Sequence, residues 1–276
     1  MTHATGGGYL KPGVLPHMWC AGCGIGTMLG AMLRSFEELG WCKTDTVVVT
    51  GIGCTGKLDD YLLTNALHTT HGRALAFATG IKAFNPRLHV VVVMGDGDGV
   101  TIGGNHFIHA ARRNIDLTAL VLNNLNYGMT GGQASATSPT ASITSTTTYG
   151  NPEREFDICA LAETAGANFV ARANTWHGWE LQHSISRALT HKGFSLVEVM
   201  SPCPTQFGRR NDMKETQAML HSLRDRSVPV ARFRALPPSE RADRFPVGTL
   251  VDRDEPGFVE RYAQVQAAAR RQARPA

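Results

Sequence analysis

Residues His89–Gln133 decide the fold and read HVVVVMGDGDGVTIGGNHFIHAARRNIDLTALVLNNLNYGMTGGQ. This stretch contains two continuous apolar runs, Val90–Met94 and Leu117–Leu122. Short, unbroken apolar runs are typical of strands that are buried on both faces of a parallel sheet. Between the two runs, apolar residues recur at helical spacing: Ile102, Phe107, Ile108 and Ala111. The pattern therefore predicts a strand, a turn, a helix and a second, parallel strand.

Polar side chains follow both predicted strands. Asp96 lies in the glycine-rich turn Gly95–Gly99, and Asn124 lies 28 residues further on. Both strands of such a unit end at the same edge of the sheet, so we expect these side chains to meet. Their oxygens suit Mg²⁺, and the glycines allow close approach to a phosphate. A Ca²⁺ loop of the EF-hand type is excluded, because Val100 and Thr101 stand where a ligand and a glycine are required.

Composition limits the class of protein. The 276 residues are 42% hydrophobic and 18% charged, with a formal charge of +4 and arginines adjacent only in isolated pairs. These values favour one large α/β domain or two small ones, and they do not suggest nucleic-acid binding. No membrane span or secretion signal is recognisable, so we expect a cytoplasmic protein. Six cysteines in such a chain favour metal ligands or free thiols over disulfides.

The rest of the chain predicts alternating helices and strands. We expect an arm over residues 1–19, a C-terminal extension over 211–276 that packs on the domain or on a partner, and one α/β domain over 1–210. Residues 134–149, rich in Ser and Thr, are either an ordered loop or lid near the site or a flexible linker. The expected elements are helices at 25–40, 74–84, 156–165, 176–189 and 258–271, and strands at 46–50, 169–172 and 194–200.

Four cysteines lie on turns or at element ends where their thiolates could face one group: Cys20, Cys23, Cys54 and Cys203. A structural zinc site would usually show a second C-x-x-C or a paired histidine, and a redox pair would leave two of the four unexplained. Four thiolates are what a 4Fe-4S cluster needs, although the spacing by itself leaves the choice open. We expect the two remaining cysteines, Cys42 and Cys159, to be free buried thiols.

Six motifs occur in order between about residues 12 and 210: WCAGCGIG, GIGCTGK, HGRALAFATGIK, GDGD, NNLNYGMTGGQ and PCPT. The combination resembles β subunits of 2-oxoacid:ferredoxin oxidoreductases, most closely the 2-oxoglutarate branch. The resemblance implies an α/β thiamine diphosphate-binding fold of the diphosphate-binding type, with a mostly parallel sheet flanked by helices. It also implies a 4Fe-4S cluster on Cys20, Cys23, Cys54 and Cys203, and Mg²⁺ on Asp96, Asn124 and the backbone carbonyl of Asn126. The long C-terminal extension departs from the simplest pattern of the family.

Further site residues follow from this resemblance and from position. Lys57 and Arg73 are candidates to bind a substrate carboxylate. Met129 is a candidate to line the substrate or thiazolium pocket, with plain core packing as the alternative. The expected cofactor-binding residues are Gly53, Thr55, His71, Gly95, Asp96, Gly97, Asp98, Asn124, Asn126, Tyr127, Gly128, Thr130 and Gln133.

The implied reaction is oxidative decarboxylation of a 2-oxoacid with coenzyme A to an acyl-CoA and CO2, with electrons passing through the cluster to ferredoxin. The reverse carboxylation is also open, and pyruvate or a broad range of 2-oxoacids is the alternative to 2-oxoglutarate. No second α/β unit of sufficient length remains in the chain. We therefore expect an α subunit to supply the pyrimidine-binding domain and the catalytic glutamate, in an αβ heterodimer or (αβ)2.

Two rival classes remain at this stage. The pattern Gly51-x-Gly53-x-x-Gly56 after a strand also fits a dinucleotide-binding dehydrogenase. However, residues 71–77 carry no Asp or Glu where that class needs one. A non-catalytic iron-sulfur or zinc module would leave Asp96 and Asn124 without a role.

Overall fold

The computed structural model describes residues 6–213 and 215–272, and it is built around an eight-stranded sheet in the order β2-β1-β3-β4-β6-β5-β8-β7. The strands from β1 to β6 run parallel, whereas β8 is antiparallel to β5. The strands are β1 Thr46–Thr50, β2 Asn65–His68, β3 His89–Gly95, β4 Leu117–Asn123, β5 Phe169–Asn174, β6 Phe194–Met200, β7 Ser227–Pro229 and β8 Phe245–Asp252. The α-helices are α1 Ile25–Glu38, α2 Ala74–Phe84, α3 Gly104–Arg113, α4 Ile158–Ala165, α5 Gly178–Thr190, α6 Thr216–Arg226, α7 Val230–Ala235, α8 Pro238–Arg241 and α9 Phe258–Gln272. Shorter helical turns are η1 Gly7–Tyr9, η2 Thr55–Tyr61, η3 Gly97–Ile102 and η4 Pro204–Gly208.

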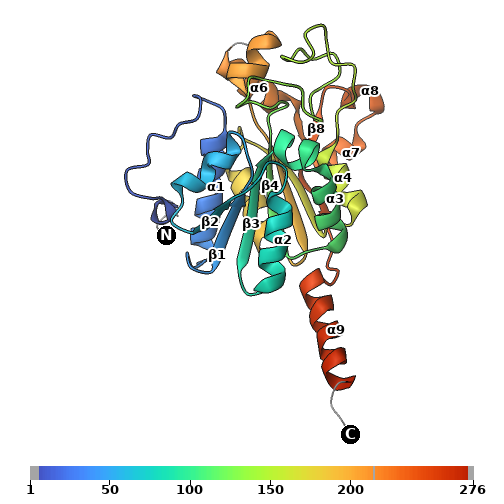
Figure 1. The fold of residues 1–276 in the computed structure, drawn as a ribbon. Helices are drawn as coiled ribbons and strands as arrows, with labels where there is room; N and C mark the ends of the chain where they lie inside the picture. The colour runs from blue at the N-terminus through green and yellow to red at the C-terminus, as the bar shows by residue number, and fades with distance from the viewer. Residues whose placement is uncertain (1–5, 214, 273–276) are drawn as a thin grey trace.

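Helices cover both faces of this sheet, as Figure 1 shows. Residues of α1 and α5 share one apolar core with Val91 and Val93, and residues of α2, α3 and α4 share another with Val90 and Val92. Successive strand residues point to opposite faces, so β3 buries every valine of its run. Each such side chain contributes about 1.5–3 kcal/mol on burial. This two-sided burial is why the strand sequences are continuously apolar.

The sheet changes direction between β1 and β3. From β1 the chain moves outward to β2, whereas from β3 it moves the other way to β4. At such a switch point the connections leave on opposite sides and open a crevice at the carboxyl ends of the strands. The turns that follow β1, β3 and β4 therefore surround one crevice.

Most predicted elements are confirmed with small shifts. The ranges of β1, α2 and β6 are as expected, and β3 and β4 are each slightly longer. Helix α4 begins two residues later than predicted, because Asp157 is its N-cap and accepts a hydrogen bond from the Ala160 amide at 3.1 Å. The expected helix between β3 and β4 is α3, which is preceded by the π-helical turn η3. Strand β2 was not predicted.

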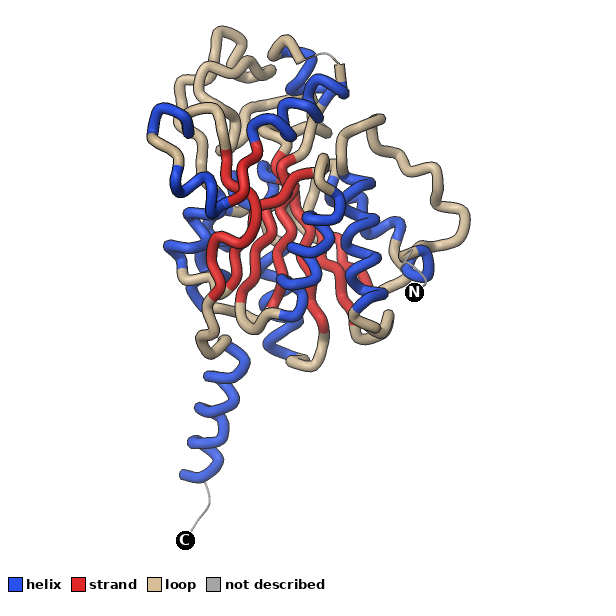
Figure 2. Tube along the Cα trace, turned by 180° about the vertical axis from the view of Figure 1, so that it is seen from behind, coloured by secondary structure: helices blue, strands red, loops and turns tan. Residues whose placement is uncertain are grey.

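The C-terminal part is more closely joined to the domain than the predicted boundary at residue 210 suggests. Strand β8 adds to the sheet beside β5, and β7 pairs with β8. The expected final helix is present as α9, which has no buried residue and projects from the body (Figures 1 and 2). Residues 1–5 of the predicted arm, residue 214 and residues 273–276 lie outside the described residues. In the described part, no helix is both long and apolar enough to span a bilayer.

Candidate functional site

A cleft of about 450 Å³ lies at the crevice beside β1, β3 and β4. It brings together every predicted cofactor-binding residue except Gln133, whose side chain bonds instead with Thr130. Met129 and Cys54 also line the cleft. Ile52 is a lining residue that was not predicted, because an apolar side chain within a glycine turn gives no sequence signal of contact with a cofactor.

Asp96 and Asn124 meet as expected. The backbone amide of Asn124 lies 3.4 Å from Asp96 Oδ1. The side-chain oxygen of Asn124 also faces acceptors, and if the carboxamide turned over, its NH2 group would donate to Asp96 Oδ1 at 3.1 Å and to the Asn126 carbonyl at 2.8 Å. The Asp96 carboxylate, the Asn124 side-chain oxygen and the Asn126 carbonyl therefore lie close together, and oxygen ligands of this kind are those that a hard cation prefers. The residues present therefore fit Mg²⁺.

Ser135 and Thr137 are site residues that sequence reasoning missed. Their hydroxyl groups donate to Asp96 Oδ2 at 2.5 Å and 2.7 Å. Burial raises the pKa of Asp96, and these two hydrogen bonds oppose the rise. Both residues belong to the Ser/Thr-rich stretch after β4, where Asn151 donates to the Ser138 carbonyl at 2.9 Å. This stretch is thus the ordered loop of the two alternatives, and it touches the site.

Asp98 joins three turns of the cleft. Its Oδ1 accepts hydrogen bonds from His71 Nδ1 at 2.5 Å, from the Gly72 amide at 2.7 Å and from the Ile52 amide at 3.3 Å. A Cβ at Gly51 would lie 1.8 Å from Asp98 Oδ2, so only glycine fits there. Asp98 therefore holds the turns after β1 and β3 against the segment that carries His71.

The four candidate cluster ligands gather at the edge of the cleft. A Cβ on Gly128 would lie 3.6 Å from Cys203 Sγ and 3.7 Å from Cys54 Sγ. Burial raises the pKa of Cys54 to about 11, with further rises from the neighbouring thiolates of Cys203, Cys23 and Cys20. Hydrogen bonds join the segments that carry these cysteines. Trp19 Nε1 donates to the Cys54 carbonyl at 2.7 Å, and Ser201 Oγ donates to the Cys23 carbonyl at 2.5 Å.

The grouping of these sulfur atoms can be compared with what a single Zn²⁺ ion requires. A single Zn²⁺ with four bonds of about 2.3 Å would hold its sulfurs about 3.8 Å apart. In the described ranges, 6–213 and 215–272, no three of the four cysteine sulfurs lie within 4.8 Å of one another. The four thiols therefore do not form the compact group that a single Zn²⁺ would hold, and four thiolates remain the ligand set that a 4Fe-4S cluster needs.

The two cysteines outside this group differ from each other. Cys159 is buried as expected, whereas Cys42 is exposed in the connection before β1, so the prediction of a buried thiol is wrong for Cys42. Its Sγ lies 3.1 Å from Thr44 Oγ1. A short connection beginning a strand has no second layer to cover it.

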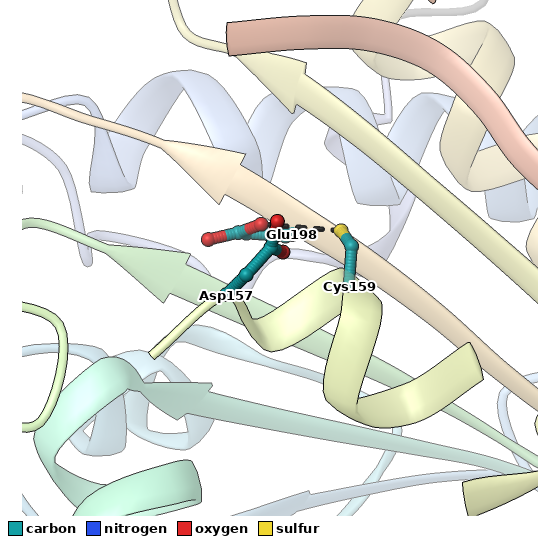
Figure 3. A group of neighbouring side chains, drawn as sticks. All are labelled: Asp157, Cys159 and Glu198. Atoms are coloured by element: carbon teal, nitrogen blue, oxygen red, sulfur yellow. Dashed lines mark hydrogen bonds between the residues drawn. The ribbon is translucent and has the colours of Figure 1, made fainter. Parts of the chain in front are cut away.

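The side chains of buried Cys159 and Glu198 lie close to the exposed Asp157, and the three turn toward one another in Figure 3. Cys159 Sγ donates to Glu198 Oε2 at 3.1 Å. The guanidinium of Arg172 already supplies the positive charge, with Nε 2.6 Å from Glu198 Oε2 and Nη2 2.5 Å from Asp157 Oδ1. Burial lowers the pKa of Arg172, but Glu198 more than offsets this and the pKa is raised. The cluster is therefore an ion-pair network and needs no metal.

The proposed carboxylate-binding residues lie outside the lining of the cleft. Lys57 Nζ pairs with Asp60 Oδ2 at 2.6 Å on η2. Arg73 precedes α2, and its guanidinium donates to the carbonyls of Gly72 and Ile102 at 3.3 Å and 3.4 Å. Their roles toward a substrate stay predictions.

Comparisons with known proteins agree with this geometry. A family model described as the C-terminal, TPP-binding domain of thiamine pyrophosphate enzymes matches residues 51–199. The 2-oxoglutarate synthase subunit KorB of Methanocaldococcus jannaschii is 44% identical over 91% of this chain and 93% of its own length. KorB of Archaeoglobus fulgidus is 55% identical over 71% of this chain and 73% of its own length.

The chain belongs to the β subunits of 2-oxoacid:ferredoxin oxidoreductases. A solved relative of this family is the 2-oxoglutarate:ferredoxin oxidoreductase from Magnetococcus marinus, with 2-oxoglutarate, coenzyme A and succinyl-CoA bound. Its chain superposes with a TM-score of 0.84 at 30% identity, covering 100% of this chain and 98% of the relative. The β-subunit fold, with its mostly parallel sheet, is thus confirmed, and the dehydrogenase reading of the Gly51 turn is set aside.

Proposed function

We propose that this chain is the β subunit of an enzyme that oxidatively decarboxylates 2-oxoglutarate with coenzyme A and passes the electrons to ferredoxin. One observation carries the proposal: Cys54 lines the same cleft as Asp96 and Asn124. A redox group on the cysteines would then stand directly beside a cofactor held by the metal site. The named substrates of the relatives support 2-oxoglutarate, with pyruvate or a broader range of 2-oxoacids as the alternative.

The chain's own residues would hold the cofactor through its diphosphate. Asp96, Asn124 and the Asn126 carbonyl would bind Mg²⁺, which would offset the negative charge of the diphosphate. At Gly97 a Cβ would lie 2.5 Å from the Tyr127 ring, so only glycine lets Tyr127 pack against the η3 turn. When bound, thiamine diphosphate supplies the electron sink for loss of CO2.

The thiols of Cys20, Cys23, Cys54 and Cys203 would hold the 4Fe-4S cluster. Loading requires loss of their protons, because the thiolate is the metal ligand. Burial, which raises the pKa of Cys54 to about 11, opposes that loss in the unloaded protein. Iron binding therefore has to displace protons from this site.

A partner is needed to complete the site. The carboxylates that line the cleft are Asp96 and Asp98. Asp96 is assigned to the metal, and Asp98 already accepts from His71, Gly72 and Ile52. Neither carboxylate is free to act on the aminopyrimidine ring. We therefore assign the catalytic glutamate that acts there to an α subunit, in an αβ heterodimer or (αβ)2. Free cysteines throughout the described chain agree with a reducing, cytoplasmic setting.

The test is anaerobic co-expression with the α subunit encoded in the same organism. We expect stoichiometric thiamine diphosphate, four irons per β chain and ferredoxin reduction that depends on coenzyme A and 2-oxoglutarate; about four irons is the content of one 4Fe-4S cluster. The β chain without α should show no turnover. The reverse carboxylation is checked with reduced ferredoxin, succinyl-CoA and CO2.

Cysteine variants make the cluster assignment specific. Cys20→Ser and Cys203→Ser should each lower iron content and abolish ferredoxin reduction. Cys159→Ser is the control, because its thiol bonds to Glu198, away from the cleft. Equal iron in all three variants would refute the assignment.

A further inference from the structure

The two carboxylate oxygens of Asp96 face different parts of the molecule. Oδ2 accepts from Ser135 at 2.5 Å and from Thr137 at 2.7 Å. Oδ1 faces the Asn124 turn, where the backbone amide lies at 3.4 Å. Asp96 is 1% exposed, and both hydroxyl donors are buried. Because all three side chains are buried, the two hydrogen bonds to Oδ2 fix the orientation of the carboxylate.

The segment that carries these hydroxyls also contacts the second ligand turn. Ser138 Oγ donates to the Leu125 carbonyl at 2.6 Å and accepts from the Ser135 amide at 2.9 Å. Leu125 lies between Asn124 and Asn126 and adopts a left-handed conformation, with φ of 67°. One short segment therefore braces both turns from which the oxygens of the metal site come.

We propose that Ser135 and Thr137 are positioning residues that make Asp96 a one-oxygen ligand and so favour Mg²⁺ over Ca²⁺. This inference rests on the proposed function. With Oδ2 engaged by two hydroxyls, only Oδ1 is available to a cation. Mg²⁺ requires near-octahedral geometry at about 2.0–2.1 Å, whereas Ca²⁺ accepts two-oxygen carboxylates and six to eight ligands. Removing the hydroxyls would free Oδ2, so that Asp96 could bind a cation with both oxygens, as Ca²⁺ accepts.

The experiment uses the αβ complex carrying Ser135→Ala, Thr137→Val or both. Metal-stripped complex is titrated calorimetrically with Mg²⁺ and then, separately, with Ca²⁺, each at fixed thiamine diphosphate. We expect the Mg²⁺ affinity of the double variant to fall about 10–100-fold, as for other groups that orient metal ligands. Ca²⁺ affinity should fall less, so that the ratio of Mg²⁺ affinity to Ca²⁺ affinity decreases.

Two matched variants control for damage to the loop. Thr144→Val removes a hydroxyl that is as buried as that of Thr137 and bonds with Thr147 at 2.7 Å rather than with Asp96. Thr137→Ser keeps the donor. Both should retain the wild-type Mg²⁺/Ca²⁺ ratio.

Each outcome decides the inference. An unchanged ratio in the double variant overturns it, as does an equal loss for both cations, which would indicate only a structural role. A narrowed ratio in Thr144→Val as well would also overturn it. A wild-type complex that binds neither Mg²⁺ nor thiamine diphosphate would instead refute the proposed function itself, and this inference with it.

Discussion

Lys57 can bind a substrate carboxylate only by giving up its ion pair with Asp60. It follows Cys54 on η2, close to the cleft, yet its ammonium group is held by Asp60 at 2.6 Å. That hydrogen bond raises the pKa of Lys57, so the side chain stays charged. To reach the distal carboxylate of a dicarboxylic substrate, Lys57 has to exchange one carboxylate for another. Such an exchange is inexpensive, because both Lys57 and Asp60 are solvent-accessible.

We predict that Lys57→Ala raises KM for 2-oxoglutarate about twofold to fivefold and leaves KM for pyruvate nearly unchanged, because only the dicarboxylic substrate has a second carboxylate to pair with this exposed ammonium group. Steady-state kinetics of the αβ enzyme with both substrates would measure this. Asp60→Asn is the matched control, since it frees Lys57 and should not raise either KM. A parallel rise for both substrates would remove Lys57 from substrate recognition.

At the scale of elements, strands β5 and β6 are joined by a buried charge network. Arg172 of β5 pairs with Glu198 of β6, and Glu198 Oε1 accepts from Asn123 at 2.8 Å at the end of β4. Asn123 Oδ1 in turn accepts from the Leu125 amide at 3.2 Å. The network thus extends from the interior of the sheet to the turn between Asn124 and Asn126.

We predict that Arg172→Met lowers the free energy of unfolding by about 3–5 kcal/mol, because it leaves Glu198 buried without its partner charge. The double variant Arg172→Met/Glu198→Gln should recover most of that loss. Arg187→Met, which breaks the exposed pair with Asp252, should cost at most about 1 kcal/mol. Chemical denaturation of the unloaded chain under reducing conditions gives all three values. A loss in the double variant as large as in the single one would contradict this reading.

The sequence predicts elements well where local pattern decides them. The runs of β3 and β4 end at Gly95 and Asn123. Of the apolar residues that predicted the helix between them, Phe107 and Ala111 are buried, whereas Ile102 and Ile108 are exposed. Strand β8 escaped prediction because it contains Pro246 and Gly248, is mostly half-buried and pairs antiparallel with a bulge between Val170 and Ala171. Whether β8 forms depends on the unpaired edge of β5, and the local sequence of β8 carries no information about that edge.

The same limit applies to the site. Asp96 and Asn124 were predictable because each follows a strand of one crossover unit. Ser135 and Thr137 reach Asp96 across 39 and 41 residues, from a loop without periodicity. The exposure of Cys42 likewise depends on the absence of a covering layer rather than on its neighbours in sequence.

At the scale of the whole molecule, the C-terminal part covers one edge of the sheet. Strand β8 pairs with β5 from Phe169 to Arg172 and so covers an edge that would otherwise present unpaired backbone groups. Open edges of apolar strands promote association between molecules. Strands β7 and β8 therefore act as part of the domain, although the charged, Pro-interrupted sequence around them suggests a separable extension.

We predict that a chain ending at residue 210 aggregates, whereas one ending at residue 256, which keeps β8 and removes α9, stays monodisperse. Size-exclusion chromatography with light scattering on both truncations, expressed without the α subunit, distinguishes the two. A monodisperse chain ending at 210 would show that β8 is dispensable.

Helix α9 begins where the Phe258 amide donates to the Asn114 carbonyl at 2.8 Å and the Val259 amide donates to Asp116 at 3.1 Å. Asn114 and Asp116 lie just before β4, at the amino end of the strands, whereas the residues that line the cleft follow the carboxyl ends of β1, β3 and β4. Helix α9 projects from the body in Figure 1. The molecule can therefore be attached to a surface through α9 while the cleft, at the other end of the sheet, stays accessible to a binding partner. A dye or surface tether at the exposed Gln264 would leave the cleft facing solution, so that docking of an electron acceptor could be followed on single molecules.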